Sequence, residues 1–433
     1  GANAQSRNPI TESWRNRFDK QDNIGVFGNV YAEVDIIKNL TVRTSFGLDK
    51  ADRRAKDFTP VTYEHAENTG TNSLSQQSNT ANTWTWTNTI VYNHVFAEKH
   101  NFKIMFGSEA IKTYAEELTA GRPDYNLLYE SDPDFLVLNA GIGTQTNSGL
   151  FNRQTLYSLF GRVDYAYNDK YLFNATLRQD QSSKFAEDTR VGYFPSAAIG
   201  WRISSEEFLT GISWLNDLKI RASWGKIGNQ NGLNFLNQYN IYENQLDQSY
   251  PISGSNSNFA TSLRQTRISN PQAKWEENIT TNIGLDATFL NNTIDLTLDV
   301  YKKETRDLLV ENQPPFTSPT GGGGSPSQPF INAGNMVNNG IDLGITKRGN
   351  IIDGMRYEVG VTFSRYKNEV TKVLDNPLAT LVGGNTREGN VTLTSVGNPV
   401  SMFYGYNILG FFNTQEEVNG YKAIYEPVGH QPV

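Results

Sequence analysis

The 433-residue chain contains no cysteine, which removes several structural and chemical possibilities. Without cysteine there is no disulfide scaffold, no thiolate metal site and no cysteine nucleophile. The four histidines, His65, His94, His100 and His430, are scattered without ligand spacing, so we expect no metal site. No stretch approaches the ~18 apolar residues of a membrane helix, although this test does not detect membrane strands, whose alternating residues average out to polar.

Positive net charge and catalytic motifs are also missing. The formal net charge is −7, whereas nucleic-acid binders usually present a basic face, so we expect no nucleic-acid partner. The stretch WGKIGN (224–229) lacks the upstream glycine of a phosphate-binding loop, and no G-x-S-x-G motif occurs. Glu276 and Glu277 are adjacent in a predicted strand, so they point to opposite faces and cannot act as a pair. We therefore expect neither an enzyme nor a bound cofactor.

Aromatic residues, in contrast, make up 12% of the chain and follow an alternating pattern. In YSLFGRVDYAYNDKYLFNATLRQD (157–180), apolar and polar residues alternate on both sides of a polar turn at 168–170. A period of two over two runs joined by a tight turn predicts a β-hairpin with one apolar and one polar face. The same pattern predicts about twelve strands in six hairpins. The other hairpins are 24–36 with 40–48, 84–96 with 102–106, 191–203 with 218–228, 275–289 with 293–302, and 341–348 with 355–366.

The predicted connections differ in length between the two ends of the strands. Within hairpins the turns are mostly short, the exception being 204–217. Between hairpins the sequence predicts long polar loops, which are uncommon in compact domains. These loops are 50–83, 113–153, 229–273 and 303–340, with a shorter one near 181–190. Short periplasmic turns and long extracellular loops are typical of outer-membrane barrels. In this layout the glycine-rich TGGGGSPSQPF (320–330) is a loop tip rather than an engineered linker.

Aromatic side chains gather near both ends of the predicted strands, as two membrane interfaces require. A soluble β-sandwich also alternates, but it needs no repeated asymmetry between short and long loops. We therefore expect the apolar face to contact lipid and the polar face to line a lumen. The expected interface aromatics are Trp84, Trp86, Tyr165, Tyr167, Tyr171, Trp201, Trp224 and Trp275. The expected lumen-facing residues are Arg162, Asp164, Arg178 and Asp180.

Five short stretches, taken in order along the chain, carry a family resemblance. They are GYFPSAAIGWRIS (192–204), LKIRASWGKIGNQ (218–230), NPQAKWEEN (270–278), NAGNMVNNGIDLGI (332–345) and GNPVSMFYGYNILGFFNTQEEV (397–418). Together they resemble the SusC/RagA class of TonB-dependent outer-membrane transporters from Bacteroidota. One such stretch is a weak signal, but five in order between predicted strands are a specific match from about 154 to 420.

The resemblance implies an all-β fold, part of a large antiparallel transmembrane β-barrel of about 22 strands around a plug. Because about twelve strands are predicted, we expect residues 1–433 to form a partial barrel domain without the plug and the closing strands. The implied function is energised import of a bulky nutrient, a glycan or an oligopeptide, across the outer membrane. The implied partners are a SusD-like surface lipoprotein, acting as a lid, and TonB, acting on the plug. A passive porin-like barrel and a soluble β-rich adhesin are the alternatives.

The predicted loop 113–153 holds aromatic residues beside carboxylates, a combination that suits sugar stacking with hydroxyl hydrogen bonds. Contact with a lid protein would use the same residues, and a loop that packs on itself would show the same composition. "DPD" at 132–134 is read as a polar turn rather than a calcium site. The candidate ligand or lid contacts are Tyr125, Tyr129, Phe135, Asp132 and Asp134.

Overall fold

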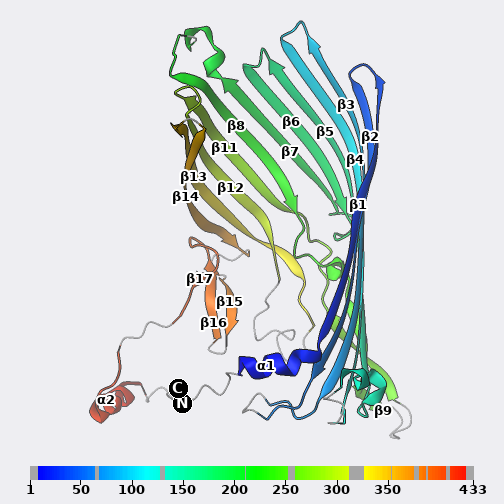
Figure 1. The fold of residues 1–433 in the computed structure, drawn as a ribbon. Helices are drawn as coiled ribbons and strands as arrows, with labels where there is room; N and C mark the ends of the chain where they lie inside the picture. Colours follow the sequence, from blue (N-terminus) through cyan, green and yellow to red (C-terminus); the bar gives the residue numbers. More distant parts are fainter. Residues whose placement is uncertain are drawn as a thin grey trace.

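The computed structural model describes most of the chain as a single curved β-sheet with small additions. The described residues are 8–63, 68–126, 132–209, 211–251, 259–311, 326–352, 354–374, 380–386, 389–405 and 410–425. Twelve antiparallel strands form the large sheet, and a two-stranded and a three-stranded sheet lie outside it (Figure 1). Neither of the two α-helices among these residues, α1 (Pro9–Arg15) and α2 (Gln415–Tyr425), is long and apolar enough to cross a membrane.

Each strand of the large sheet pairs with the next strand of that sheet along the chain, and only β8 and β11 are separated by other strands, β9 and β10. Its strands are β1 (Lys20–Ile37), β2 (Leu40–Thr59), β3 (Ser73–Phe96), β4 (His100–Pro123), β5 (Thr146–Tyr167), β6 (Tyr171–Ser182), β7 (Val191–Arg202), β8 (Leu215–Asn229), β11 (Glu276–Phe289), β12 (Ile294–Glu311), β13 (Phe330–Ile352) and β14 (Met355–Val373). The small sheets are made of β9 (Ile241–Pro251) with β10 (Phe259–Arg267), and of β15 (Thr380–Thr386), β16 (Gly389–Ser395) and β17 (Met402–Phe403). The all-β class is confirmed, and the six predicted hairpins correspond to the twelve strands of the large sheet; the two small sheets were not predicted, and β9 and β10 lie within the predicted loop 229–273.

The tight turns lie together at one end of the sheet, at the top of Figure 1. At the β5–β6 turn, Asn168 and Asp169 both have φ of 52°. Two central residues with positive φ give a turn whose twist matches that of the flanking strands, and Asn and Asp tolerate this conformation better than other side chains. The sequence therefore specifies both the hairpin and its register at this end.

The strands are longer than the alternation predicts, and the predicted loops are correspondingly shorter. β3 and β4 each have 24 residues, whereas a tilted strand crosses a bilayer in about 9–11. The predicted loops 50–83 and 113–153 are therefore wrong at their ends, because β2 runs on to Thr59 and β4 to Pro123. In these outer halves both strand faces are polar, so strand pairing continues where the hydrophobic period has disappeared.

One face of the sheet carries a continuous apolar band next to the tight turns. Residues directly opposite in an antiparallel pair share a face, so the register identifies its members. On β5 the band runs from Tyr157 to Tyr167, and these two residues lie opposite Ala110 and His100 of β4. Eleven residues at about 3.4 Å each, tilted by about 45°, cover roughly 25 Å, the height of the apolar band of a membrane barrel.

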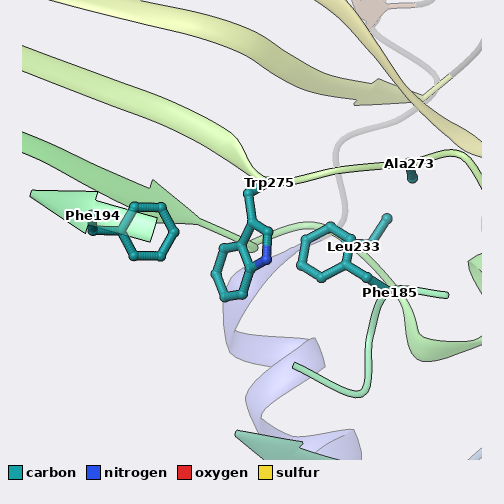
Figure 2. Packing of buried hydrophobic residues seen from close by; sticks show 5 residues of the cluster. All are labelled: Phe185, Phe194, Leu233, Ala273 and Trp275. Atoms are coloured by element: carbon teal, nitrogen blue, oxygen red, sulfur yellow. The ribbon is translucent and has the colours of Figure 1, made fainter. Parts of the chain in front are cut away.

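Buried apolar side chains gather in two clusters at the long-loop end of the sheet rather than within a sandwich. The Trp275 cluster comprises Phe185, Phe194, Leu233, Ala273 and Trp275 (Figure 2). The Tyr125 cluster comprises Phe58, Leu74, Tyr125 and Leu136. The long loops therefore have cores of their own, which hold them against the strands.

Candidate functional site

The polar face of the sheet is organised by ion pairs, and Arg178 on β6 is the centre of the first. Its Nη2 donates to Glu109 Oε1 on β4 at 2.8 Å and to Ser158 Oγ on β5 at 2.7 Å. Its Nε donates to Asp180 Oδ1 at 2.7 Å. Arg178 therefore ties three strands together on the polar face, which Asp180 shares; that this face lines a lumen stays a prediction.

Arg162 and Asp164, the other two predicted lumen-facing residues, form a pair within β5. Arg162 Nη2 lies 2.6 Å from Asp164 Oδ1, and its Nε lies 2.8 Å from Oδ2. The register places both on the same face as Ser158 and Arg178. The Arg162 side chain is 45% exposed, compared with 32% for Arg178, so this pair is the more solvated of the two.

A second network, which the sequence analysis did not identify, lies on β8, β11 and β12. Arg221 Nη1 contacts Asp299 at 2.7 Å, and Arg221 Nε contacts Asp286 at 3.2 Å. Lys219 Nζ also contacts Asp286, at 2.8 Å. A Cβ on Gly284 would lie 2.4 Å from Arg221 Cζ, so glycine at this position lets the guanidinium lie across β11. The period of two in 218–228 puts Lys219 and Arg221 on the polar face. This alternation was the sequence signal from which their participation in a network could have been predicted.

Two hollows on the polar face lie beside these networks. One, of about 420 Å³, is lined by Lys103, Asp164, Lys219 and Arg221 among others. The other, of about 490 Å³, includes Arg178. Among the described residues, no group of three or more His, Asp or Glu is placed to hold a metal ion. The arrangement provides a polar, charge-balanced wall, suited to contact with water, polar ligands or another polar segment.

Seven of the eight predicted interface aromatics share the apolar face. The register places them there together with Tyr157 and Val163 of β5, and they are Trp84, Trp86, Tyr165, Tyr167, Tyr171, Trp201 and Trp224. At the tight-turn end, Tyr171 stacks between Tyr167 and Trp201, with ring centroids 6.3 and 6.4 Å apart. Contact of these rings with lipid remains a prediction.

The prediction that the eighth aromatic residue, Trp275, lies at the lipid interface is wrong. Only 7% of Trp275 is exposed, and its ring centroid lies 4.9 Å from that of Phe185 and 5.4 Å from that of Phe194 (Figure 2). Its Nε1 donates to the carbonyl oxygen of Arg190 at 3.0 Å. The physical reason is position: Trp275 immediately precedes β11, where the β6–β7 and β8–β9 connections fold over it.

The Trp275 cluster is also where three of the family-like stretches meet. Phe194 comes from the first stretch, Gly228 from the second, and Trp275 from the third. A Cβ on Gly228 would lie 2.1 Å from the Phe194 ring, so glycine is needed for the ring to fit. The fourth stretch joins through Asn332, whose Nδ2 donates to the carbonyl oxygen of Lys274 at 2.9 Å. Residues of these four stretches therefore pack together at the long-loop end of the sheet.

Tyr125, predicted to contact a ligand or lid, is instead a packed residue. It is 5% exposed, its ring meets Phe58 edge-on at 5.8 Å, and its hydroxyl donates to the carbonyl oxygen of Val137 at 3.0 Å. Burial raises the pKa of the Tyr125 hydroxyl. The sequence left open the alternative that this loop packs on itself, and Tyr125 fits that alternative.

The remaining candidates of this loop lie at the surface or outside the described residues. Asp132 caps the short 3₁₀ helix Pro133–Phe135, accepting from the backbone N–H of Asp134 at 3.0 Å. Phe135 is 54% exposed. Tyr129 lies outside the described residues. Ligand or lid contact by Phe135, Asp132 and Asp134 stays a prediction.

Comparison with known proteins gives consistent matches. Residues 2–421 match the family model described as TonB dependent receptor-like, beta-barrel. TonB-dependent receptor P3 of Formosa agariphila is 28% identical over 386 residues, which cover 89% of this chain and 37% of that protein. TonB-dependent receptor SusC of Bacteroides thetaiotaomicron is 30% identical over 364 residues, which cover 79% of this chain and 34% of that protein.

Solved structures show the same fold. The RagAB peptide transporter superposes with a TM-score of 0.74 at 24% identity, covering 89% of this chain and 40% of that one. The siderophore receptor PiuA of Acinetobacter baumannii superposes with a TM-score of 0.50 at 17% identity, covering 88% and 51%. The chain thus spans little more than a third of the curated relatives that it matches.

Proposed function

Because the chain belongs to the TonB dependent receptor-like β-barrel family, we propose that it forms the wall of an energised importer of bulky nutrients. It is of the SusC/RagA type found in Bacteroidota, and the outer membrane is its location. The observation that carries the proposal is the family match over residues 2–421, nearly the whole length of the chain.

The two faces of the sheet support a role as a barrel wall. The apolar face has the height of a membrane band, and the polar face carries the Arg178 and Arg221 networks. In the part of the chain described, β1 and β14 are the two edges of the large sheet (Figure 1). Unpaired edges cannot face lipid, so further strands of the whole protein must close the barrel. We infer that residues 1–433 are a partial barrel domain and that the plug and closing strands lie outside them.

We infer that the partners are a SusD-like surface lipoprotein over the long loops and TonB acting through the plug. The long-loop end suits a docked lid, because the Trp275 and Tyr125 clusters fix the loops against the strands. The cargo is a glycan or an oligopeptide. A structural neighbour is described as a peptide transporter, which supports the oligopeptide, and exposed Phe135 beside two aspartates suits either cargo.

The test is purification of the tagged full-length protein from outer membranes in detergent, followed by mass spectrometry of co-purifying proteins. We expect a surface lipoprotein in stoichiometric amount. Uptake of the cargo found with the complex should stop when TonB is deleted. A detergent-extracted barrel without a lipoprotein, with uptake independent of TonB, would identify the porin-like alternative instead. Recovery in the aqueous fraction would contradict the membrane assignment and favour the adhesin alternative.

A further inference from the structure

The apolar band ends in basic residues at its long-loop edge. On each strand, the apolar face can be followed from the tight turn toward the long loops. On six strands, the first charged residue beyond the apolar band on this face is basic. These residues are Lys50 on β2, Lys112 on β4, Arg153 on β5, Lys226 on β8, Lys302 on β12 and Arg365 on β14. The first charged residue beyond the band is acidic on two strands: it is Asp22 on β1 and Glu277 on β11. The chain as a whole has 38 basic and 45 acidic residues. Basic residues are therefore in excess at this edge, although acidic residues are in excess in the whole chain.

Three of the six basic residues, Lys112, Arg153 and Arg365, have no acidic partner among the described residues. The other three are paired: Lys50 with Asp52 at 3.0 Å, Lys226 with Glu277 at 2.7 Å, and Lys302 with Glu304 at 2.5 Å. Arg365 lies alone on β14, whereas β4 and β5 bring two of these unpaired basic residues, Lys112 and Arg153, next to each other.

Lys112 and Arg153 are neighbours on the same face. Lys112 lies opposite Thr155, and Arg153 lies opposite Tyr114, so the two cations are diagonal neighbours. Diagonal positions are about 7–8 Å apart, which lets two long side chains reach one anion. Like charges this close repel each other and destabilise the protein when no anion is bound. An anion between the two cations therefore removes this repulsion.

The surroundings place this pair at the level of lipid headgroups. Trp84 lies directly opposite Lys112 on β3, and tryptophan is enriched at membrane interfaces. The next row outward on the same face holds two carboxylates: Asp52, which pairs with Lys50, and Glu116, which lies diagonally from Arg153 and accepts from the Tyr114 hydroxyl at 3.0 Å. These contacts leave the cations facing the rim of the apolar band.

We propose that Lys112 and Arg153 bind the phosphate of a lipid headgroup in the outer leaflet, with Trp84 against the adjoining acyl chains. The occupant is a phosphorylated lipid, because the site adjoins the apolar band and presents two neighbouring basic side chains that form no ion pair among the described residues. The proposal rests on the sheet spanning the membrane and is independent of the cargo and the lid.

The test compares two lipids on the full-length protein in non-ionic detergent. Binding of monophosphoryl lipid A and of its dephosphorylated form is measured by native mass spectrometry. We expect the phosphorylated lipid to bind at least 10-fold more tightly. In the double variant Lys112→Gln/Arg153→Gln its affinity should fall by about 30-fold, since each basic residue near an anionic surface contributes about 1 kcal/mol.

The matched control is Lys38→Gln/Lys99→Gln, which removes the same charge from the tight turns and should leave the affinity within about twofold. The variant Lys112→Arg/Arg153→Lys keeps both charges and should also bind the phosphorylated lipid. Its binding would show that substitution at these two positions does not by itself misfold the protein. Equal binding of the two lipids by the wild type, or an unchanged affinity of the double variant, would overturn the proposal. So would displacement of the lipid by millimolar inorganic phosphate, which would identify a site for the free anion.

Discussion

Phe194 shows at the scale of one residue why small side chains recur in the family-like stretches. Its ring contacts Trp275 edge-on and lies close to Gly192 and Gly228. A Cβ at Gly192 would lie 2.5 Å from the ring, and one at Gly228 would lie 2.1 Å from it. The two glycines therefore admit the aromatic ring that holds the long-loop end together.

Gly228→Ala should displace Phe194 and destabilise the protein by about 1–3 kcal/mol, the usual cost of overpacking. The measurement is thermal unfolding of the full-length protein in detergent. Gly344→Ala is the control, because a Cβ there meets nothing within 4 Å. Equal transition temperatures for the two variants would show that the Phe194 contact does not limit stability.

Arg178→Met should destabilise the barrel by about 2 kcal/mol, because the change leaves Glu109 and Asp180 without their charged hydrogen bonds across three strands. Arg162→Met is the matched control, since the partner of Arg162 lies on the same strand and is more solvated. The control should cost less than about 1 kcal/mol, as exposed pairs do. Denaturant unfolding measures both, and a control as damaging as Arg178→Met would refute the cross-strand role.

Glu206 makes the tight-turn end sensitive to acid. Its carboxylate accepts from Tyr171 Oη at 2.7 Å, from Trp201 Nε1 at 3.1 Å and from Lys170 Nζ at 3.2 Å. These donors, the tyrosine first, lower the pKa of Glu206. Because the folded pKa lies below the ordinary value of 4.5, the stabilisation is complete above about pH 4.5. It is lost as the pH falls through the lowered pKa.

Glu206→Gln should therefore lose less stability than the wild type between pH 5 and pH 3. Unfolding temperatures at intervals of half a pH unit, measured for both proteins, check this expectation. Parallel curves over that interval would mean that the ionised carboxylate does not stabilise the turn.

At the scale of the element, the hairpins could be predicted from the sequence but the full strand lengths could not. Alternation identifies β5 and β6 correctly because one face is apolar over the membrane band. It fails in the outer half of β3, where residues such as Gln77 and Asn79 are polar whichever way they point. It also misplaced Trp275, because burial beneath two loops is a tertiary contact that no local period records.

Hydrogen exchange provides the test of these outer halves. Backbone amides over 74–82 and 113–122 should be protected in the full-length protein in detergent, since they pair in the β3–β4 ladder. Thr144 and Gln145, which are exposed and connect to β5 outside any strand, supply the internal comparison and should exchange rapidly. If 74–82 exchanged as fast as that connection, the long strands would be wrong and the loop prediction right.

At the scale of the whole molecule, the twelve strands make a wall whose two faces differ in polarity. The candidate site was only partly predictable: alternation placed Arg162 and Arg178 on the polar face, but the Arg221 network depends on pairing among β8, β11 and β12. Tyr125 was misassigned because composition cannot distinguish a loop that binds from a loop that packs. The central claim is that the apolar face meets lipid while the polar face meets a lumen.

A pair of neighbouring residues on β4 tests this claim most directly, and the absence of cysteine in the chain makes labelling specific. Ile104 lies on the apolar face opposite Val163, and Lys103 lies on the polar face opposite Asp164. Ile104→Cys and Lys103→Cys, each made in a full-length background without other cysteines, are labelled with bimane and reconstituted in brominated lipid. We expect strong quenching at 104 and little at 103. Equal quenching at the two positions, or the reverse order, would contradict this claim.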